Sequence, residues 1–111
     1  MIAVIFEVEP AEGKSERYFD IAATLRDELA KADGFISVER FQSLTNDKKY
    51  LSLSFWTDQE SVQKWYTQTD HTAAQSEGRA GVFKNYRIRV ADVFRDYDMA
   101  TGRPADQGKS I

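Results

Sequence analysis

Hydrophobic residues at the start of the chain alternate between two sides, and this period of two is typical of a β-strand. One face of the predicted strand, residues 2–9, carries Ile2, Val4, Phe6 and Val8. Between Ser15, a candidate N-cap, and Gly34, apolar positions instead recur at intervals of three and four residues. That spacing predicts a helix with one apolar side, which would cover one face of a sheet.

Two further runs with strand character follow, FISVERFQSL and KKYLSLSFW, and the polar sequence TND between them predicts a hairpin. In the second run Leu51, Leu53 and Phe55 alternate with a mixed set of residues. The next residues, TDQE, form a candidate capping box in which Thr57 begins a second helix. The run NYRIRVADVF then predicts a closing strand.

The second predicted helix has an apolar side made of Val62, Trp65 and Tyr66. Asp70 is a candidate cap for a further turn that begins at His71, so we expect a bend at this point. Such a bend would direct His71 towards the same cleft as Trp65. The pair is therefore a candidate site.

The predicted order βαββαβ is typical of a ferredoxin-like α+β fold, a four-stranded antiparallel sheet with both helices on one face. We expect one domain over residues 1–98 and a polar C-terminal tail over residues 99–111. The uncovered face of the sheet is expected to carry Ile5, Tyr50 and Trp56. Because such a face is more apolar than soluble monomers usually expose, we expect a homodimer in which two sheets pack face to face.

Composition narrows the function classes. The chain has 111 residues, a net charge of −3, no cysteine and one histidine. An acidic chain gives nucleic acid little to bind, and no apolar run approaches the length of a membrane span. The start of the chain lacks the features of a signal peptide, so we expect a cytoplasmic protein. With one histidine and no cysteine, the chain is not expected to bind a transition metal. It also contains no dinucleotide-binding motif, so we expect no bound cofactor.

The chain resembles the antibiotic biosynthesis monooxygenase family, whose members are small dimeric α+β barrels. The resemblance covers residues 1–98 and rests on LSLSFWTDQESVQKW, HTAAQSEGR and YRIRVADVFRDYD. Members of the family include cofactor-independent oxygenases of quinols and anthrones, and also enzymes that degrade haem. The resemblance therefore implies one fold but leaves several reactions open.

Individual positions of the family can be compared with this sequence. In the quinol-oxidising branch a helical tryptophan corresponds to Trp65, and two polar site residues correspond to Ser61 and His71. In the haem-degrading branch the axial histidine corresponds to Gln75, and a first-strand asparagine falls near Phe6. An amide is a poor replacement for imidazole on iron, which argues against haem degradation. The resemblance implies catalytic roles for His71 and Trp65, with Ser61, Phe6 and Gln75 around the substrate.

The favoured function is cofactor-independent oxygenation of a small phenolic or quinol-like compound. A histidine can accept a phenolic proton near neutral pH, and a tryptophan supplies a flat apolar wall. Two alternatives stay open: a non-catalytic protein that binds a small ligand or a partner, and an isomerase or lyase on the same scaffold. Equally, Trp65 could fill the core and His71 could be a surface residue.

Overall fold

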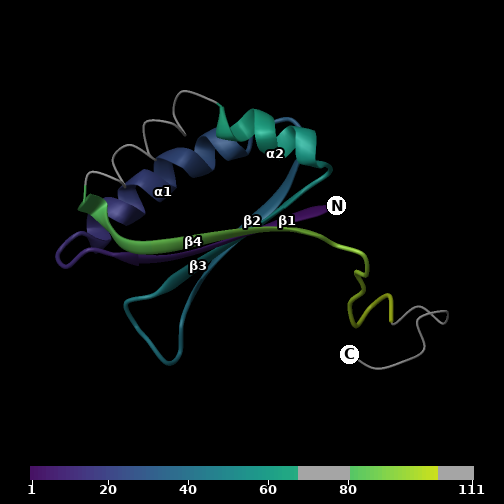
Figure 1. The fold of residues 1–111 in the computed structure, drawn as a ribbon. Coiled ribbons are helices and arrows are strands. Elements are labelled where there is room, and N and C mark those ends of the chain that lie inside the picture. The colour runs from purple at the N-terminus through teal and green to yellow at the C-terminus, as the bar shows by residue number, and fades with distance from the viewer. Residues whose placement is uncertain (68–80, 103–111) are drawn as a thin grey trace.

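The computed structural model describes residues 1–67 and 81–102. Within these residues the elements are β1 (Ile2–Pro10), α1 (Ser15–Leu29), β2 (Phe35–Gln42), β3 (Tyr50–Trp56), α2 (Gln59–Tyr66) and β4 (Phe83–Asp92). The strands form an antiparallel sheet in the order β2-β3-β1-β4, and both helices lie on the same side of it (Figure 1). The predicted ferredoxin-like α+β fold is confirmed. The turn predicted after Asp70 lies outside the described residues, as does most of the predicted tail.

The pairing of β1 with both neighbours fixes which side chains face the helices. Val4 lies opposite Ser54 on β3 and opposite Val90 on β4. Cross-strand partners share a face of the sheet, so this set points the same way. On β1 the buried residues Val4 and Val8 are four positions apart and so lie on the same face of the strand; their exposed fractions are 8% and 1%. The alternation read from the first residues therefore identifies the core side of the central strand.

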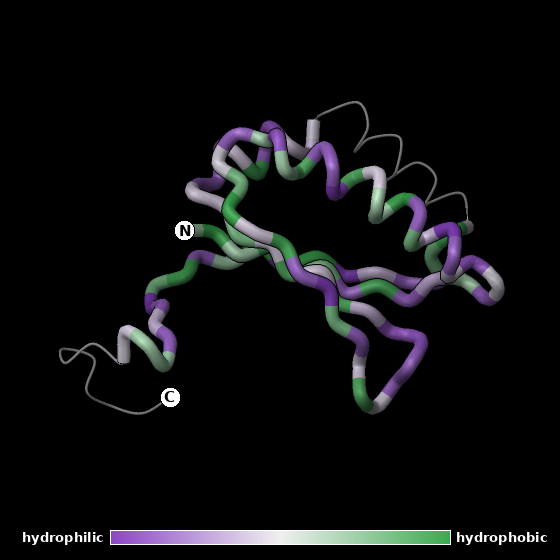
Figure 2. The backbone as a smooth tube through the Cα atoms, turned by 180° about the vertical axis from the view of Figure 1, so that it is seen from behind, coloured by the Kyte–Doolittle hydropathy of each residue, from purple (hydrophilic) through white to green (hydrophobic). Residues whose placement is uncertain are grey.

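Two groups of apolar side chains hold the helices on the sheet. The first combines residues of both helices with the ends of β1 and β3, namely Ile2, Val4, Leu29, Trp56, Val62 and Trp65. The second lies at the other end of α1 and contains Val8, Tyr18, Ile21 and Val82. Figure 2 shows hydrophobic and hydrophilic positions interspersed along the helices and strands. The core therefore lies between the helix layer and the sheet.

The expected composition of the uncovered sheet face is wrong at two of three positions. Trp56 lies opposite Ile2 and is 1% exposed, so it faces the helices. Tyr50 stacks on Tyr18 of α1, with ring centroids 6.0 Å apart, and faces the same way. Ile5 is on the uncovered side as expected, opposite Leu53. The core side of β3 carries two serines between its aromatic ends, whereas the uncovered side carries Leu51, Leu53 and Phe55, so the alternation alone does not identify the core side.

The helices begin and end at slightly different residues from those predicted. The N-cap of α2 is Asp58, whose side chain accepts a 2.8 Å hydrogen bond from the Ser61 N–H, so the prediction of Thr57 is wrong by one residue. The first helix ends at Leu29, before the Gly34 expected. Gly34 instead has a φ of +76° and its carbonyl accepts a 2.8 Å hydrogen bond from the Thr57 N–H. It therefore ties the start of β2 to the end of β3.

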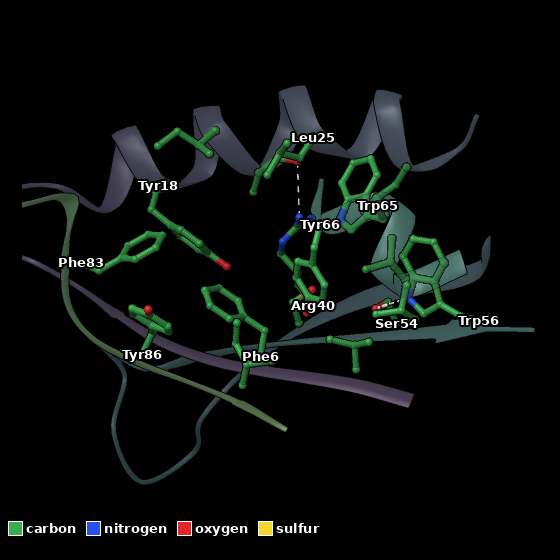
Figure 3. Close-up of a pocket in the computed structure, with 18 residues that line it drawn as sticks. Phe6, Tyr18, Leu25, Arg40, Ser54, Trp56, Trp65, Tyr66, Phe83 and Tyr86 are labelled. Carbon is green, nitrogen blue, oxygen red and sulfur yellow. Dashed lines mark hydrogen bonds between the residues drawn. The ribbon is translucent and has the colours of Figure 1, made fainter. Parts of the chain in front are cut away.

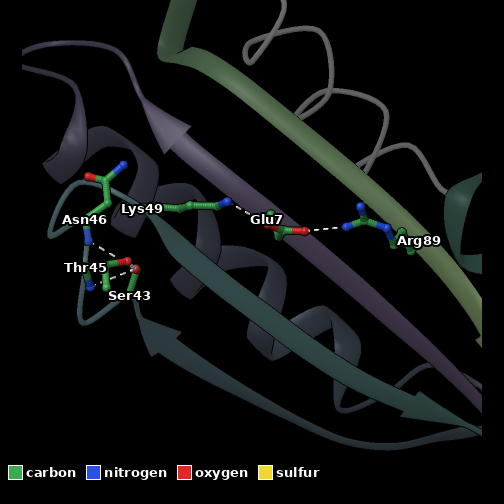
Figure 4. A network of polar contacts seen from close by, with 6 residues as sticks. All are labelled: Glu7, Ser43, Thr45, Asn46, Lys49 and Arg89. Carbon is green, nitrogen blue, oxygen red and sulfur yellow. Dashed lines mark hydrogen bonds and ion pairs between the residues drawn. The ribbon is translucent and has the colours of Figure 1, made fainter.

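A charged cluster lies on the uncovered face, where Glu7 of β1 accepts from cations on both sides (Figure 4). The Lys49 Nζ lies 2.7 Å from one carboxylate oxygen, and the Arg89 Nη1 lies 2.5 Å from the other. The hydrogen bond from Lys49, together with the two positive charges, holds the pKa of Glu7 below its usual value, although partial desolvation opposes this. The carboxylate thus stays ionised and paired.

The loop between β2 and β3 is longer than the predicted TND connection and spans residues 43–49. The Ser43 hydroxyl accepts hydrogen bonds from the N–H groups of Thr45 and Asn46, at 3.2 and 3.1 Å (Figure 4). The Lys49 N–H donates to the Asn46 carbonyl at 3.0 Å. These local bonds replace the short turn that the polar triplet suggested.

Candidate functional site

A cavity of about 230 Å³ lies between the helices and the sheet (Figure 3). Its lining comes from all six described elements, and most of it is apolar. At β4 the lining includes Tyr86 and Ile88, which are 48% and 39% exposed, so the cavity approaches the surface there. Small-molecule sites are commonly concave, largely apolar and furnished with a few polar groups. This cavity has that character.

One end of the cavity is walled by two tryptophans. Trp65 of α2 and Trp56 of β3 have ring centroids 6.1 Å apart and are 5% and 1% exposed. The Trp56 indole N–H donates to the Ser54 hydroxyl at 3.0 Å. The N-cap at Asp58 starts the helix so that Val62 and Trp65, three residues apart, lie over the sheet. Helix geometry thus places Trp65 against the cavity.

The other end is lined by tyrosine and phenylalanine rings. Phe6 of β1 lies 6.0 Å, centroid to centroid, from both Phe83 and Tyr86. Tyr18 of α1 makes an edge contact with Phe83, also at 6.0 Å. Aromatic pairs at such distances are favourable and leave flat surfaces on which another ring can pack. This end suits a small aromatic molecule.

Between these two ends stands a cationic side chain, Arg40 of β2 (Figure 3). Arg40 pairs across the strands with Ser52, which also lines the cavity. Its Nη2 donates a long hydrogen bond of 3.4 Å to the Ala22 carbonyl of α1. Its Nε is buried and has no hydrogen-bond partner in the described part of the chain. A guanidinium is thus held in an apolar space with donor capacity left over.

The buried phenol of Tyr18 and the partly buried phenol of Tyr66 add neutral groups to the lining. Burial raises the pKa of Tyr18 above its usual value, and the positive charge of Arg40 partly offsets this. Burial also raises the pKa of Tyr66. Both hydroxyls are therefore protonated at neutral pH and can donate a hydrogen bond to a ligand oxygen.

The structure brings together only some of the residues expected from the sequence. Trp65 and Phe6 both line the cavity. Ser61 lies in the first turn of α2, beside Gly34, and is not among the described lining residues. His71 and Gln75 fall in residues 68–80, outside those described. The roles of all five residues stay predictions.

Arg40 is the residue that sequence reasoning missed. A signal for it exists, because Val38 and Arg40 are two residues apart on a predicted strand and so share a face. Had Val38 been assigned to the core side, Arg40 would have been identified as a charge directed at the helices. An arginine in that position is unusual enough to mark a candidate ligand site.

Two further properties of residues 1–67 and 81–102 bear on the site. Neither described helix has the length and apolarity needed to cross a membrane. Among the same residues, no three His, Cys, Asp or Glu side chains group as metal ligands.

Comparisons with known proteins agree with this architecture. The family model described as antibiotic biosynthesis monooxygenase matches residues 1–77. A protein of Pyricularia oryzae named Jasmonate monooxygenase ABM is 46% identical over 93 residues, which make up 84% of this chain and 43% of that protein. The chain therefore spans less than half the length of this relative.

Two solved structures share the fold at low sequence identity. A protein from Deinococcus radiodurans has a TM-score of 0.80 and 9% identity, over 89% of this chain and 98% of that one. SnoaB, a cofactor-independent oxygenase from Streptomyces nogalater, has a TM-score of 0.75 and 14% identity, over 86% and 94% of the two chains. Because the family model covers more than half of the residues, the chain belongs to the antibiotic biosynthesis monooxygenase family.

Proposed function

We propose that this protein is a monooxygenase that oxidises a small phenolic or quinol-like compound in the cavity between helices and sheet, without a bound cofactor. The observation that carries the proposal is an apolar, aromatic-lined cavity of about 230 Å³ with Trp65 in its wall and phenol donors in its lining. Family membership supports monooxygenase chemistry. The absence of cysteine and the single histidine support a reaction that uses no transition metal.

The proposed reaction requires a base, a shape and access for dioxygen. A base removes the phenolic proton, and the electron-rich phenolate passes one electron to dioxygen. The resulting radicals combine into a peroxide on a ring carbon, and the base returns its proton to the outer oxygen. That oxygen then leaves as water together with the hydrogen of the ring carbon, which becomes the new carbonyl of a quinone. One oxygen atom enters the product and the other leaves as water. His71, the only histidine of the chain, is our candidate base because its unperturbed pKa lies near neutrality.

The cavity lining supports the steps that do not move protons. Trp65 supplies a flat wall against which a substrate ring can pack. The protonated hydroxyls of Tyr18 and Tyr66 can donate to the substrate oxygen as it gains negative charge. An apolar enclosure also limits the water that would quench the radicals.

A direct test is dioxygen consumption by purified protein with a panel of quinols and anthrones. Jasmonate belongs in the panel because one relative is named for its oxidation. We expect uptake of one dioxygen per product formed, and His71→Ala should reduce turnover by roughly 10²-fold or more. Binding without uptake across the panel would favour a ligand-binding protein. Product formation under nitrogen would favour an isomerase or lyase.

The proposal includes a homodimer assembled through the uncovered face of the sheet. This face has apolar side chains on neighbouring strands: Ile5, Phe41, Leu51, Leu53 and Phe55. Its most central acid, Glu7, is already paired with Lys49 and Arg89 and so adds little net charge. Two such faces can therefore pack together with Glu7 already paired, whereas Glu39, which lies opposite Leu53 on the same face, has to stay at the rim of the interface or meet a cation of the other copy.

A further inference from the structure

The guanidinium of Arg40 is unusual in its surroundings. It extends from the core side of β2 into the space beneath α1, where it reaches the Ala22 carbonyl only at 3.4 Å (Figure 3). Its Nε is buried and lacks a hydrogen-bond partner among the described residues. A buried donor left without an acceptor costs more than a typical hydrogen bond gains, so an additional acceptor is expected to occupy this position.

The charge of Arg40 is also unbalanced within the described lining. None of the described residues around the cavity is an aspartate or a glutamate, and the polar ones are serines and tyrosines. A positive charge in such a space attracts an anion strongly, because little water is present to screen it. An anion would therefore supply both the hydrogen-bond acceptor and the negative charge that Arg40 lacks among the described residues.

We propose that Arg40 binds the carboxylate of a small aromatic acid, and that the compound oxidised by this protein belongs to that class. The second part rests on the proposed monooxygenase function, whereas the binding of a carboxylate does not. The planar guanidinium matches the two oxygens of a carboxylate, which it can hold with paired hydrogen bonds.

The neighbours of Arg40 fit this occupant. Ser52 is its cross-strand partner, and the neutral Tyr18 hydroxyl is close enough for the guanidinium to influence its pKa. Both can donate to a carboxylate oxygen. A phosphate would carry up to two negative charges, and Arg40 is the one Lys or Arg side chain in the described lining. A phenolate would form only near pH 10, whereas a carboxylate is ionised throughout the neutral range.

The cavity size and its two aromatic ends limit the rest of the ligand. A space of about 230 Å³ is small for a ligand site and suits a single ring with a short acidic side chain. With the carboxylate at Arg40, the ring is directed either towards Phe6 and Phe83 or towards Trp65, and it packs on aromatic surfaces at either end (Figure 3).

The test is equilibrium binding by calorimetry under nitrogen, so that turnover plays no part. The probes are 3-phenylpropanoate, its methyl ester, its primary amide, and 4-ethylphenol. We expect the carboxylate to bind roughly tenfold to a hundredfold more tightly than the ester or amide, as is typical of a hydrogen bond to a charged group. Equal binding of carboxylate, ester and amide would overturn the proposal. Tighter binding of 4-ethylphenol would do the same, because it would assign Arg40 to a phenol oxygen.

Three variants assign the preference to Arg40. Arg40→Met keeps the volume but removes the charge, and should abolish the carboxylate preference while leaving ester binding unchanged. Arg40→Lys keeps the charge without the planar pair of donors and should retain part of the preference. Arg26→Met is the control, because Arg26 is exposed in the last turn of α1, and its preference should equal that of the wild type.

A preference that survives in Arg40→Met would show that another group binds the carboxylate, and would overturn the assignment. If Arg40→Met does not fold, Arg40→Lys and the wild-type probe series still decide. The outcomes separate from those of the proposed function. A carboxylate preference without dioxygen consumption would support the binding site and reject the monooxygenase. Dioxygen consumption with neutral quinols, without any carboxylate preference, would support the monooxygenase and reject the carboxylate site.

Discussion

The indole N–H of Trp56 donates to the hydroxyl of Ser54, 3.0 Å away and two residues back on the same strand, and both residues are buried. Ser54→Ala removes this acceptor and leaves a buried donor unpaired. We expect a loss of about 1–3 kcal/mol in the free energy of unfolding, measured by urea denaturation.

A double-mutant cycle separates the hydrogen bond from other effects of Ser54. Trp56→Phe removes the donor, so Ser54→Ala should cost about 1 kcal/mol less in that background than in the wild type. The same cost in both backgrounds would show that the bond adds no stability of its own.

Gly34 occupies a position that both its backbone and its neighbours restrict. Its φ is +76°, and a Cβ there would lie 2.6 Å from the Thr57 Oγ1 and overlap the Ser61 side chain. Gly34→Ala should therefore destabilise the protein by more than the roughly 1–2 kcal/mol of the left-handed backbone alone. Gly13→Ala is the matched control, because Gly13 has a φ of +77° and open space around it. Equal losses in the two variants, measured by urea denaturation, would show that the contact with α2 is not restrictive.

The cap of α2 distinguishes two readings of the sequence TDQE. The Asp58 carboxylate accepts from the Ser61 N–H, and this bond holds the pKa of Asp58 below its usual value. Asp58→Ala should lower the thermal midpoint at neutral pH more than Thr57→Ala does. A larger loss for Thr57→Ala would restore the predicted capping box.

Particular residues show how far the sequence could lead. On β1, Val8 lies between Glu7 and Glu9, so the period of two there was enough to identify the buried side. On β3 the more apolar side is the uncovered one, because the core side carries two serines, and the core side became evident only from the pairing of Trp56 with Ile2. The rings of Tyr50 and Trp56 pack beneath the helices, which a count of apolar positions does not reveal.

The same limit applies to the candidate site. The three-residue spacing of Val62 and Trp65 predicted that they share the apolar side of the second helix, and the structure shows that this side lines the cavity. Arg40 could not be placed without knowing which side of β2 faces α1, and that depends on its pairing with Ser52. A local pattern predicts which residues share a face, whereas only the pairing of strands decides what that face contacts.

Glu7 predicts a pH dependence of stability. Lys49 and Arg89 hold the pKa of its carboxylate below the usual range in the folded protein. A lowered pKa means that the folded state gains from ionisation, so the contribution is present above the usual glutamate range and is lost as pH falls through the folded pKa. Glu7→Gln should therefore destabilise at neutral pH and converge with the wild type in acid.

Thermal midpoints of both proteins between pH 2 and pH 7 measure this difference, which should shrink in high salt because the pairs are exposed to solvent. Glu9→Gln is the control. The Glu9 carboxylate lies 3.9 Å from the Lys84 Nζ, a longer distance than in the Glu7 pairs, so this substitution should change the dependence of the thermal midpoint on pH less. A constant difference between wild type and Glu7→Gln at all pH values would contradict the assignment.

Association through the uncovered sheet face gives the last prediction, and it depends on the corrected orientation of β3. Leu53 is on the uncovered side opposite Ile5, whereas Tyr50 stacks on Tyr18 beneath α1. Leu53→Asp should weaken the dimer and leave the fold intact, so that light scattering reports 12.7 kDa where the wild type gives twice that mass. Tyr50→Asp should instead cost on the order of 3 kcal/mol of folding free energy, because it places a carboxylate in the core. A wild-type monomer at micromolar concentration would reject the interface. Dissociation by Tyr50→Asp with unchanged stability would reverse the assignment of the two faces.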